Sequence, residues 1–283
     1  MLRLFSRRDP AATEDYLLVT YDSVRYDSYA AARTPVIDRY AVARPAGAQA
    51  TFTLAAHVAM FHGFLPHGFC EEPYYNRFVK QLWRLPHRRQ AHIPAKLSFP
   101  KGTRSIIDGF RHLGYYTCAT AAMAWFRHPN LQEGWHDFLW TGIDGRRQVA
   151  WLQERVRRQR RPVFALINFG ETHAPYRYGE GVKGSAGEAA AREARRGLRV
   201  KQAEWRFDEE NWRRQVECTE FLDHLMGDLL AFWGDLGRRA TVVVCGDHGD
   251  CFGEDGLYGH GFYHPKVMEV PLAIFEFDPE GER

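Results

Sequence analysis

The stretch at residues 240–261, ATVVVCGDHGDCFGEDGLYGHG, decides the fold and indicates the chemistry. It opens with ATVVVC, an apolar run typical of a strand buried inside an α/β sheet. Glycines then recur as far as Gly261 and suit a backbone that turns sharply around a bound group. Asp247, His248 and His260 are natural ligands for a divalent metal that prefers oxygen and nitrogen. We therefore expect a strand that leads into a metal-binding loop.

The rest of the chain alternates short apolar runs with segments of helical period, which is the pattern of an α/β sheet covered by helices. Further strands are expected at residues 16–20, 115–120, 162–169 and 270–277. Helices are expected to open at Thr34-Pro35, after a cap at Thr103, at Thr53 or Leu54, and to span residues 144–160 and 208–233. The alternation predicts a mostly parallel central sheet with helices on both faces.

The chain has 283 residues, of which 45% are hydrophobic and 26% charged, so it can bury a sizeable core. It contains no internal repeat and no low-complexity linker, and we expect a single domain over residues 1–283. The segment at residues 179–210 is highly charged. It is interpreted either as a solvated excursion or as a lid over a site at the sheet edge.

Composition also excludes some classes of protein. A net charge of +3 is not the balance of a nucleic-acid-binding protein, although the pI is about 8.6. No apolar run approaches the ~18 residues that span a bilayer, and the N-terminus has no stretch typical of a signal peptide. The five cysteines are odd in number and lack C-x-x-C spacing. We expect a cytoplasmic protein with reduced thiols, no membrane span and no specific nucleic-acid partner.

Polar side chains follow three of the expected strands at the points where these strands end. Asp22 and Ser23 follow the first, residues 171–173 (Glu-Thr-His) follow the third, and Asp247 and His248 follow the fourth. Because the carboxyl ends of parallel strands meet at one edge of a sheet, these groups are expected to converge there.

Together, these motifs resemble the alkaline phosphatase superfamily, in its sulfatase-like and phosphotransferase branch. The family's D-S-x-R occurs in VTYDSVR at residues 19–25, its nucleophile segment as TLAAHVAMFHGFLPHG from residue 53, and its H-x-P-Y as HAPY at residues 173–176. Its D-H-G-E motif occurs at residues 247–261 with Asp250 in place of the first Glu. The resemblance covers about residues 16–277 and implies an alkaline phosphatase-like fold. Relatives usually continue beyond the last strand, so we expect much of their C-terminal subdomain to be lacking.

The resemblance also implies a metal site. It places Asp22, Thr53, Asp247 and His248 around one divalent ion, zinc or manganese, and it makes Thr53 the nucleophile. A threonine hydroxyl is weak until a metal lowers its pKa, so this assignment agrees with the chemistry. Two other interpretations stay open: Thr53 acts as a helix N-cap, or Thr51 is the nucleophile. Whether a second metal binds also stays open.

Three further histidines fall near these motifs. His173 and His260 are expected to bind the transferred group or to protonate the leaving oxygen. His57 falls where sulfatases carry Arg, and it is interpreted either as a substrate contact or as a satisfied core histidine. Cys245 and Cys251 are interpreted as ordinary thiols, because soft ligands mix poorly with this oxygen-rich set.

Departures from the sulfatase pattern direct the functional prediction. Thr53 cannot mature to the aldehyde that sulfatases use, and AAMA at residues 121–124 replaces their segment with Lys and His. We therefore expect a metal-dependent phosphoester hydrolase or phosphotransferase that uses a phospho-threonine intermediate, similar to phosphoethanolamine and lipoteichoic-acid transferases. Its substrate would be a small-molecule, lipid or nucleotide phosphodiester or a phosphonate-type ester. The alternatives are a mutase, a sulfuric ester hydrolase, and a catalytically silent metal-binding protein.

Overall fold

The computed structural model describes residues 14–63, 104–178 and 206–281, and it places a seven-stranded sheet at the centre. The strand order is β2-β9-β6-β1-β5-β3-β4. Strands β6, β1, β5, β3 and β4 run parallel, whereas β9 is antiparallel to both of its neighbours. The predicted mostly parallel sheet is therefore confirmed. The strands are β1 (Asp15–Tyr21), β2 (Arg44–Gly47), β3 (Tyr116–Ala121), β4 (Asp137–Trp140), β5 (Val163–Phe169), β6 (Ala240–Gly246) and β9 (Glu269–Phe277), with a separate two-stranded pair, β7 (Cys251–Phe252) and β8 (Tyr258–Gly259).

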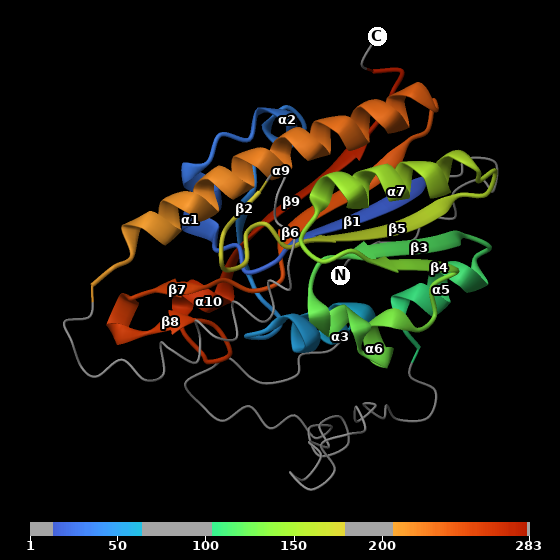
Figure 1. Cartoon of the computed structure of the whole chain (residues 1–283). Helices are drawn as coiled ribbons and strands as arrows, with labels where there is room; N and C mark the ends of the chain where they lie inside the picture. Colours follow the sequence, from blue (N-terminus) through green and yellow to red (C-terminus); the bar gives the residue numbers. More distant parts are fainter. Residues whose placement is uncertain (1–13, 64–103, 179–205, 282–283) are drawn as a thin grey trace, which may run out of the picture.

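Helices cover both faces of this sheet (Figure 1). One face carries α1 (Tyr26–Ala31), α2 (Pro35–Asp38), α7 (Gly145–Arg157) and α9 (Glu209–Asp235). The other carries α3 (Thr53–His62), α5 (Ile106–His112) and α6 (Pro129–Gln132). Shorter pieces are η2 (Ala124–Arg127), η3 (Glu254–Gly256) and α10 (Pro265–Met268). None of the helices in the described ranges has the length and apolarity to cross a bilayer.

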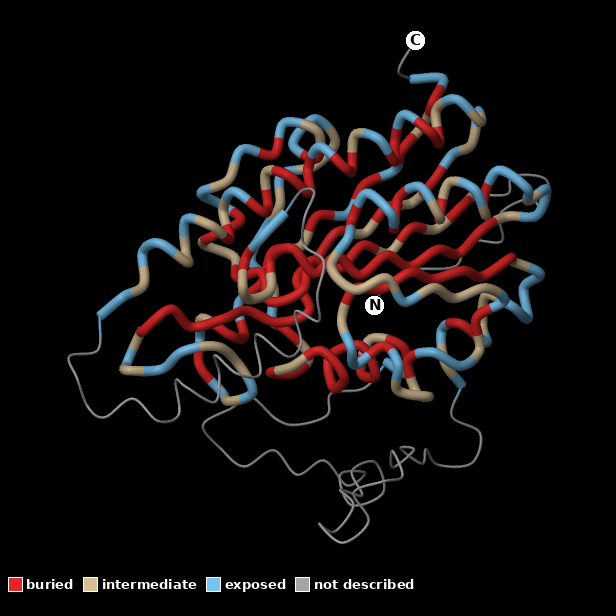
Figure 2. Tube along the Cα trace, in the orientation of Figure 1, coloured by how far each residue is buried: buried red, intermediate tan, exposed pale blue. Residues whose placement is uncertain are grey.

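Alternation along the strands builds two cores. In β1, Leu17 and Val19 pack in the core under α7 and α9, whereas Tyr16 and Leu18 pack against the core that includes α3. Successive strand side chains point to opposite faces, so one apolar run serves both layers. Figure 2 shows the result as buried central strands under helices whose outer surfaces are exposed.

Several predicted boundaries need correction. The helix after Thr34 is only the four-residue α2. Helix α5 is capped by Ser105, whose side chain accepts from Asp108 N in a capping box, whereas the predicted cap Thr103 lies outside the described residues. Strands β2 and β4 were not expected, because each has four residues and largely exposed or half-buried side chains. Such short segments carry no clear apolar run or period.

The proposed lid at residues 179–210 falls mostly outside the described residues, which resume at residue 206. Its last two residues, Glu209 and Glu210, belong instead to the first turn of α9. Acidic side chains in that position interact favourably with the N-terminal end of the helix dipole.

The sheet order explains how distant polar residues meet. Strand β1 lies between β6 and β5, and Tyr21 at its end pairs with both Gly246 and Phe169. The residues that follow each strand therefore leave the sheet at the same level. This is the convergence expected from the sequence.

Candidate metal centre and active site

Four buried side chains meet at this edge of the sheet. Asp22 follows β1, Asp247 and His248 follow β6, and Thr53 is the first residue of α3. Thr53 Oγ1 lies 3.3 Å from Asp22 Oδ2 and 3.4 Å from His248 Nε2. One ligand atom from each of the two aspartates and the histidine lies within 4.8 Å of the others. The structure thus brings together all four predicted metal ligands.

The hydrogen bonds around these ligands leave specific atoms free for a cation. Asp247 Oδ1 accepts from the backbone N–H groups of Ser23, at 3.1 Å, and His248, at 2.9 Å. Asp247 Oδ2 is buried and has no hydrogen-bond partner among the described residues. His248 Nδ1 lies 3.1 Å from the carbonyl of Gly249, which can only accept, so Nδ1 carries the hydrogen. The lone pair of Nε2 therefore remains available for coordination.

Burial of two neighbouring carboxylates also makes a positive charge favourable at this site. Burial, reinforced by Asp247, raises the pKa of Asp22 to about 6, and burial raises the pKa of Asp247 to about 6. Burial lowers the pKa of His248 to about 4, which favours the neutral imidazole that metals bind. A divalent cation would offset the repulsion between the two carboxylates. Carboxylates, one hydroxyl and one imidazole suit zinc or manganese, so the residues present fit the predicted ion.

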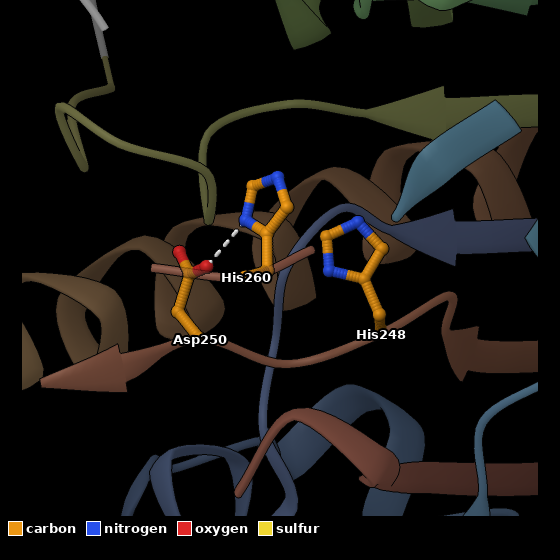
Figure 3. A group of neighbouring side chains, drawn as sticks. All are labelled: His248, Asp250 and His260. Atoms are coloured by element: carbon orange, nitrogen blue, oxygen red, sulfur yellow. Dashed lines mark hydrogen bonds and ion pairs between the residues drawn. The ribbon is translucent and has the colours of Figure 1, made fainter. Parts of the chain in front are cut away.

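A second group consists of His248, Asp250 and His260 (Figure 3), and it shares His248 with the first. His260 Nδ1 lies 2.6 Å from Asp250 Oδ1. Burial alone would lower the pKa of His260, but Asp250 outweighs burial and raises it to about 9. Burial alone would likewise raise the pKa of Asp250, and its histidine neighbours, His260 foremost, lower it to about 2. These two side chains form an ion pair, which is a poorer arrangement for a second metal.

His173 completes the histidine cluster. It follows β5, and its Nδ1 donates to the carbonyl of Ala174 at 2.7 Å. Its ring centroid lies 5.3 Å from that of His260, which is 4.3 Å from that of His248. Both histidines predicted to act on the substrate therefore lie next to the metal ligands.

Thr53 has no capping role, unlike the alternative reading of the sequence. It is the first helical residue of α3, and the N-cap is Phe52, whose side chain cannot accept a hydrogen bond. The Thr53 hydroxyl is directed to Asp22 and His248 instead. The rival residue, Thr51, is buried and accepts from Gly261 N through its carbonyl at 2.8 Å.

The expectation of a substrate contact at His57 finds no support in the structure. The side chain is fully buried against Phe126, with ring centroids 4.7 Å apart. Nδ1 donates to the carbonyl of Thr53 at 2.9 Å, and Nε2 lies 3.0 Å from Thr20 Oγ1. Both ring nitrogens therefore have protein partners. His57 is a core histidine that supports the first turn of α3, the second of the two readings of the sequence.

Two buried amides support the site and were missed in the sequence. Asn168 on β5 donates through Nδ2 to Asp22 Oδ2 at 3.3 Å. Gln215 on α9 donates through Nε2 to the carbonyls of Ser23 and Thr172, both at 2.9 Å. Each is a polar residue on an otherwise apolar face, and that exception is the signal that could have identified it.

Comparisons with known proteins agree with this architecture. The C-terminal periplasmic domain of phosphoethanolamine transferase EptC from Campylobacter jejuni has a TM-score of 0.62 and 12% identity, covering 95% of this chain and 81% of that one. A putative sulfatase from Bacteroides fragilis has a TM-score of 0.65 and 15% identity, covering 96% and 70%. The zinc complex of the corresponding EptC domain from Escherichia coli has a TM-score of 0.60 and 11% identity, covering 96% and 76%.

The sequence itself matches no family model and no curated protein. At these low identities the structural likeness establishes the fold. The chain has the alkaline phosphatase-like α/β fold, as the motifs predicted. Proteins named as phosphoethanolamine transferases and sulfatases share it.

Proposed function

We propose that this protein is a metal-dependent phosphoester hydrolase or phosphotransferase that forms a covalent phospho-threonine at Thr53. The observation that carries the proposal is the position of the Thr53 hydroxyl, which is buried, free of any capping role and in contact with Asp22 and His248. The zinc complex of a protein with the same fold supports a divalent ion at these ligands. When bound, the ion would supply positive charge that lowers the pKa of the hydroxyl and offsets charge on the phosphoryl group.

The chain's own residues account for the remaining requirements of the reaction. Thr53 Oγ1 already donates to Asp22 at 3.3 Å, so its hydrogen is directed to a carboxylate as the oxygen attacks phosphorus. The N-terminal end of α3, a helix of ten residues, has no side-chain cap at Phe52. Its first-turn N–H groups are therefore suited to phosphoryl oxygens, which interact favourably with a helix N-terminus.

The proposed substrate is a phosphodiester or a phosphonate-type ester of a small molecule, lipid or nucleotide. A site with one metal suits a singly charged phosphodiester better than a doubly charged monoester. A sulfuric ester is disfavoured, because residues 121–124 (AAMA) offer neither the Lys nor the His of the sulfatase pattern. The name of the Campylobacter jejuni neighbour supports transfer as one outcome of the same chemistry.

The test is removal of the hydroxyl. Thr53→Ala should keep the fold and lose turnover of an aryl phosphodiester by about 10⁴-fold or more, since removing a covalent nucleophile has effects of that order. Thr53→Ser should retain partial activity, and Thr51→Ala is the matched control that should be mild. Mass spectrometry after an acid quench should find a phosphoryl group on the peptide that contains Thr53. Full activity of Thr53→Ala would refute the covalent route, and metal binding without product from any ester would favour the silent alternative.

A further inference from the structure

Asn168 is the only polar residue of strand β5, and its side chain is fully buried beside Asp22. In the sheet register it lies between Thr20 of β1 and Ala121 of β3. Its Nδ2 atom donates to Thr20 Oγ1 at 3.0 Å and to Asp22 Oδ2 at 3.3 Å. Its Oδ1 atom accepts from the backbone N–H of Met123 at 3.3 Å. An N–H group can only donate, so Met123 fixes which end of the amide is the oxygen and turns the amide donor toward Asp22.

The two carboxylate oxygens of Asp22 therefore have different surroundings. Oδ2 accepts from Asn168 and, at 3.3 Å, from Thr53 Oγ1. Oδ1 has only longer contacts, with the Ser23 hydroxyl at 3.4 Å and with Thr53 Oγ1 at 3.5 Å, and it lies 4.0 Å from His248 Nε2. A carboxylate oxygen has two lone pairs, so two donors occupy Oδ2, whereas Oδ1 keeps a lone pair for a cation.

The candidate ligand atoms have the spacing of a four-coordinate site when Asp22 contributes Oδ1 alone. His248 Nε2 lies 3.4 Å from Thr53 Oγ1, 3.5 Å from Asp247 Oδ2 and 4.0 Å from Asp22 Oδ1. Thr53 Oγ1 and Asp22 Oδ1 are 3.5 Å apart. A tetrahedral zinc ion with bonds of about 2.0–2.2 Å separates its ligands by roughly 3.3–3.6 Å. Three of the four separations lie in that range and the fourth is somewhat longer, so these atoms can surround one ion without Asp22 Oδ2.

We propose that Asn168 is a positioning residue that restricts Asp22 to coordination through Oδ1 and thereby makes the site select zinc over manganese. The inference rests on the proposed function only in requiring a divalent ion at these ligands. Zinc sites are mostly tetrahedral, whereas manganese favours six oxygen ligands. A carboxylate that could turn and bind through both oxygens would add an oxygen ligand and favour manganese. The amide donor on Asp22 Oδ2 opposes that second bond.

The competing interpretation is that Asn168 only satisfies buried hydrogen bonds inside the sheet. Gln148 of α7 provides the comparison, because it is another fully buried amide. Its Nε2 atom donates to the backbone carbonyl of Asn168 at 2.8 Å, so it is directed to the same strand rather than to Asp22. Loss of either amide disturbs the same part of the sheet, but only loss of the Asn168 side chain removes a donor from Asp22 Oδ2.

Equilibrium binding of zinc and of manganese tests this selectivity without any substrate. Asn168→Leu and Asn168→Ala both remove the amide donor, the first with and the second without a side chain of similar size. Each should lower the ratio of the manganese to the zinc dissociation constant by about 10–100-fold, the effect typical of losing a group that orients a metal ligand. Gln148→Leu is the matched control and should leave that ratio unchanged. Thermal midpoints of the chelator-treated proteins show that each variant is folded.

Two spectroscopic measurements report the coordination directly. In the cobalt-substituted unmodified protein and in Gln148→Leu, the visible bands should be intense, as for a four-coordinate ion, and both Asn168 variants should give the weaker bands of higher coordination. X-ray absorption of the zinc-loaded unmodified protein needs no variant. It should find four nitrogen or oxygen neighbours at about 2.0–2.1 Å.

The outcomes separate this inference from the phospho-threonine route. Five or six neighbours around zinc in the unmodified protein would overturn it, and so would equal weakening of zinc and manganese binding in the folded Asn168 variants. Neither result depends on turnover, so the covalent role of Thr53 would still stand or fall on its own test. Failure of the unmodified protein to bind either metal would overturn both proposals.

Discussion

Asp247→Asn should make the metal-free protein more stable at neutral pH, although the same change abolishes metal binding. Asp247 is fully buried, and burial raises its pKa from 3.8 to about 6. The pKa of Asp247 is higher in the folded than in the unfolded state. Its protonation therefore adds to the free energy of unfolding at low pH, and this contribution is lost as the pH rises through about 6. The difference between 3.8 and about 6 lowers the free energy of unfolding at pH 7 by ~3 kcal/mol, since a tenfold change in proton affinity is worth roughly 1.36 kcal/mol.

An asparagine at this position can keep the hydrogen bonds that the aspartate accepts. Its amide oxygen can still accept from the N–H groups of Ser23 and His248 at the place of Oδ1. Its NH₂ group would then occupy the place of Oδ2, 3.5 Å from His248 Nε2, which has a lone pair. The change removes a buried charge, and one amide hydrogen can face the lone pair of His248 Nε2.

The assay is denaturation of chelator-treated protein at pH 7 and pH 4, with and without added zinc. At pH 7 the free energy of unfolding of metal-free Asp247→Asn should exceed that of the unmodified protein by ~3 kcal/mol, which raises the thermal midpoint by roughly 6–10 °C. At pH 4 the difference should fall below ~1 kcal/mol, since Asp247 is then mostly protonated. Zinc should stabilise only the unmodified protein.

Asp15→Asn is the matched control for a buried aspartate that has a cation partner. Asp15 is about 1% exposed, and its carboxylate contacts Arg238 Nη2 at 2.6 Å and Trp233 Nε1 at 2.9 Å. Its loss leaves the guanidinium poorly paired and should destabilise the protein by a few kcal/mol with or without zinc. If Asp247→Asn destabilised the metal-free protein equally at both pH values, Asp247 would act mainly through its hydrogen bonds, and the reasoning from buried charge would be refuted.

Two further substitutions test the surroundings of the site. Gly249→Ala should destabilise the protein by several kcal/mol in chemical denaturation, because a Cβ there would lie 2.2 Å from the carbonyl of Lys266; a change within ~0.5 kcal/mol would show that the loop can shift. His57→Gln should lower the free energy of unfolding by ~1–3 kcal/mol with KM unchanged, because its partners are the Thr53 carbonyl and Thr20. A raised KM at unchanged stability would restore the predicted substrate contact.

Strong local patterns made most of the architecture predictable from the sequence. The runs at residues 16–20, 162–169 and 240–245 lie within β1, β5 and β6, apart from Pro162 before β5, because an apolar run of that length is stable only inside a covered sheet. Strands β2 and β4 were not predicted from the sequence, since four residues with little burial take their conformation from the neighbouring strand. Their backbone pairing with β9 and β3 is a tertiary interaction.

The residue types at the strand ends predicted that candidate metal ligands would gather at one edge of the sheet, because the carboxyl ends of parallel strands lie together, as Asp22, Asp247 and His248 do. Only the tertiary structure decided the roles of the other polar residues. His57 lies in the core, and Asp250 pairs with His260. Neither contact could be predicted, because such hydrogen bonds depend on distances in the folded chain that no spacing in the sequence specifies. Local pattern determines which chemical groups are present, and packing determines which of them meet.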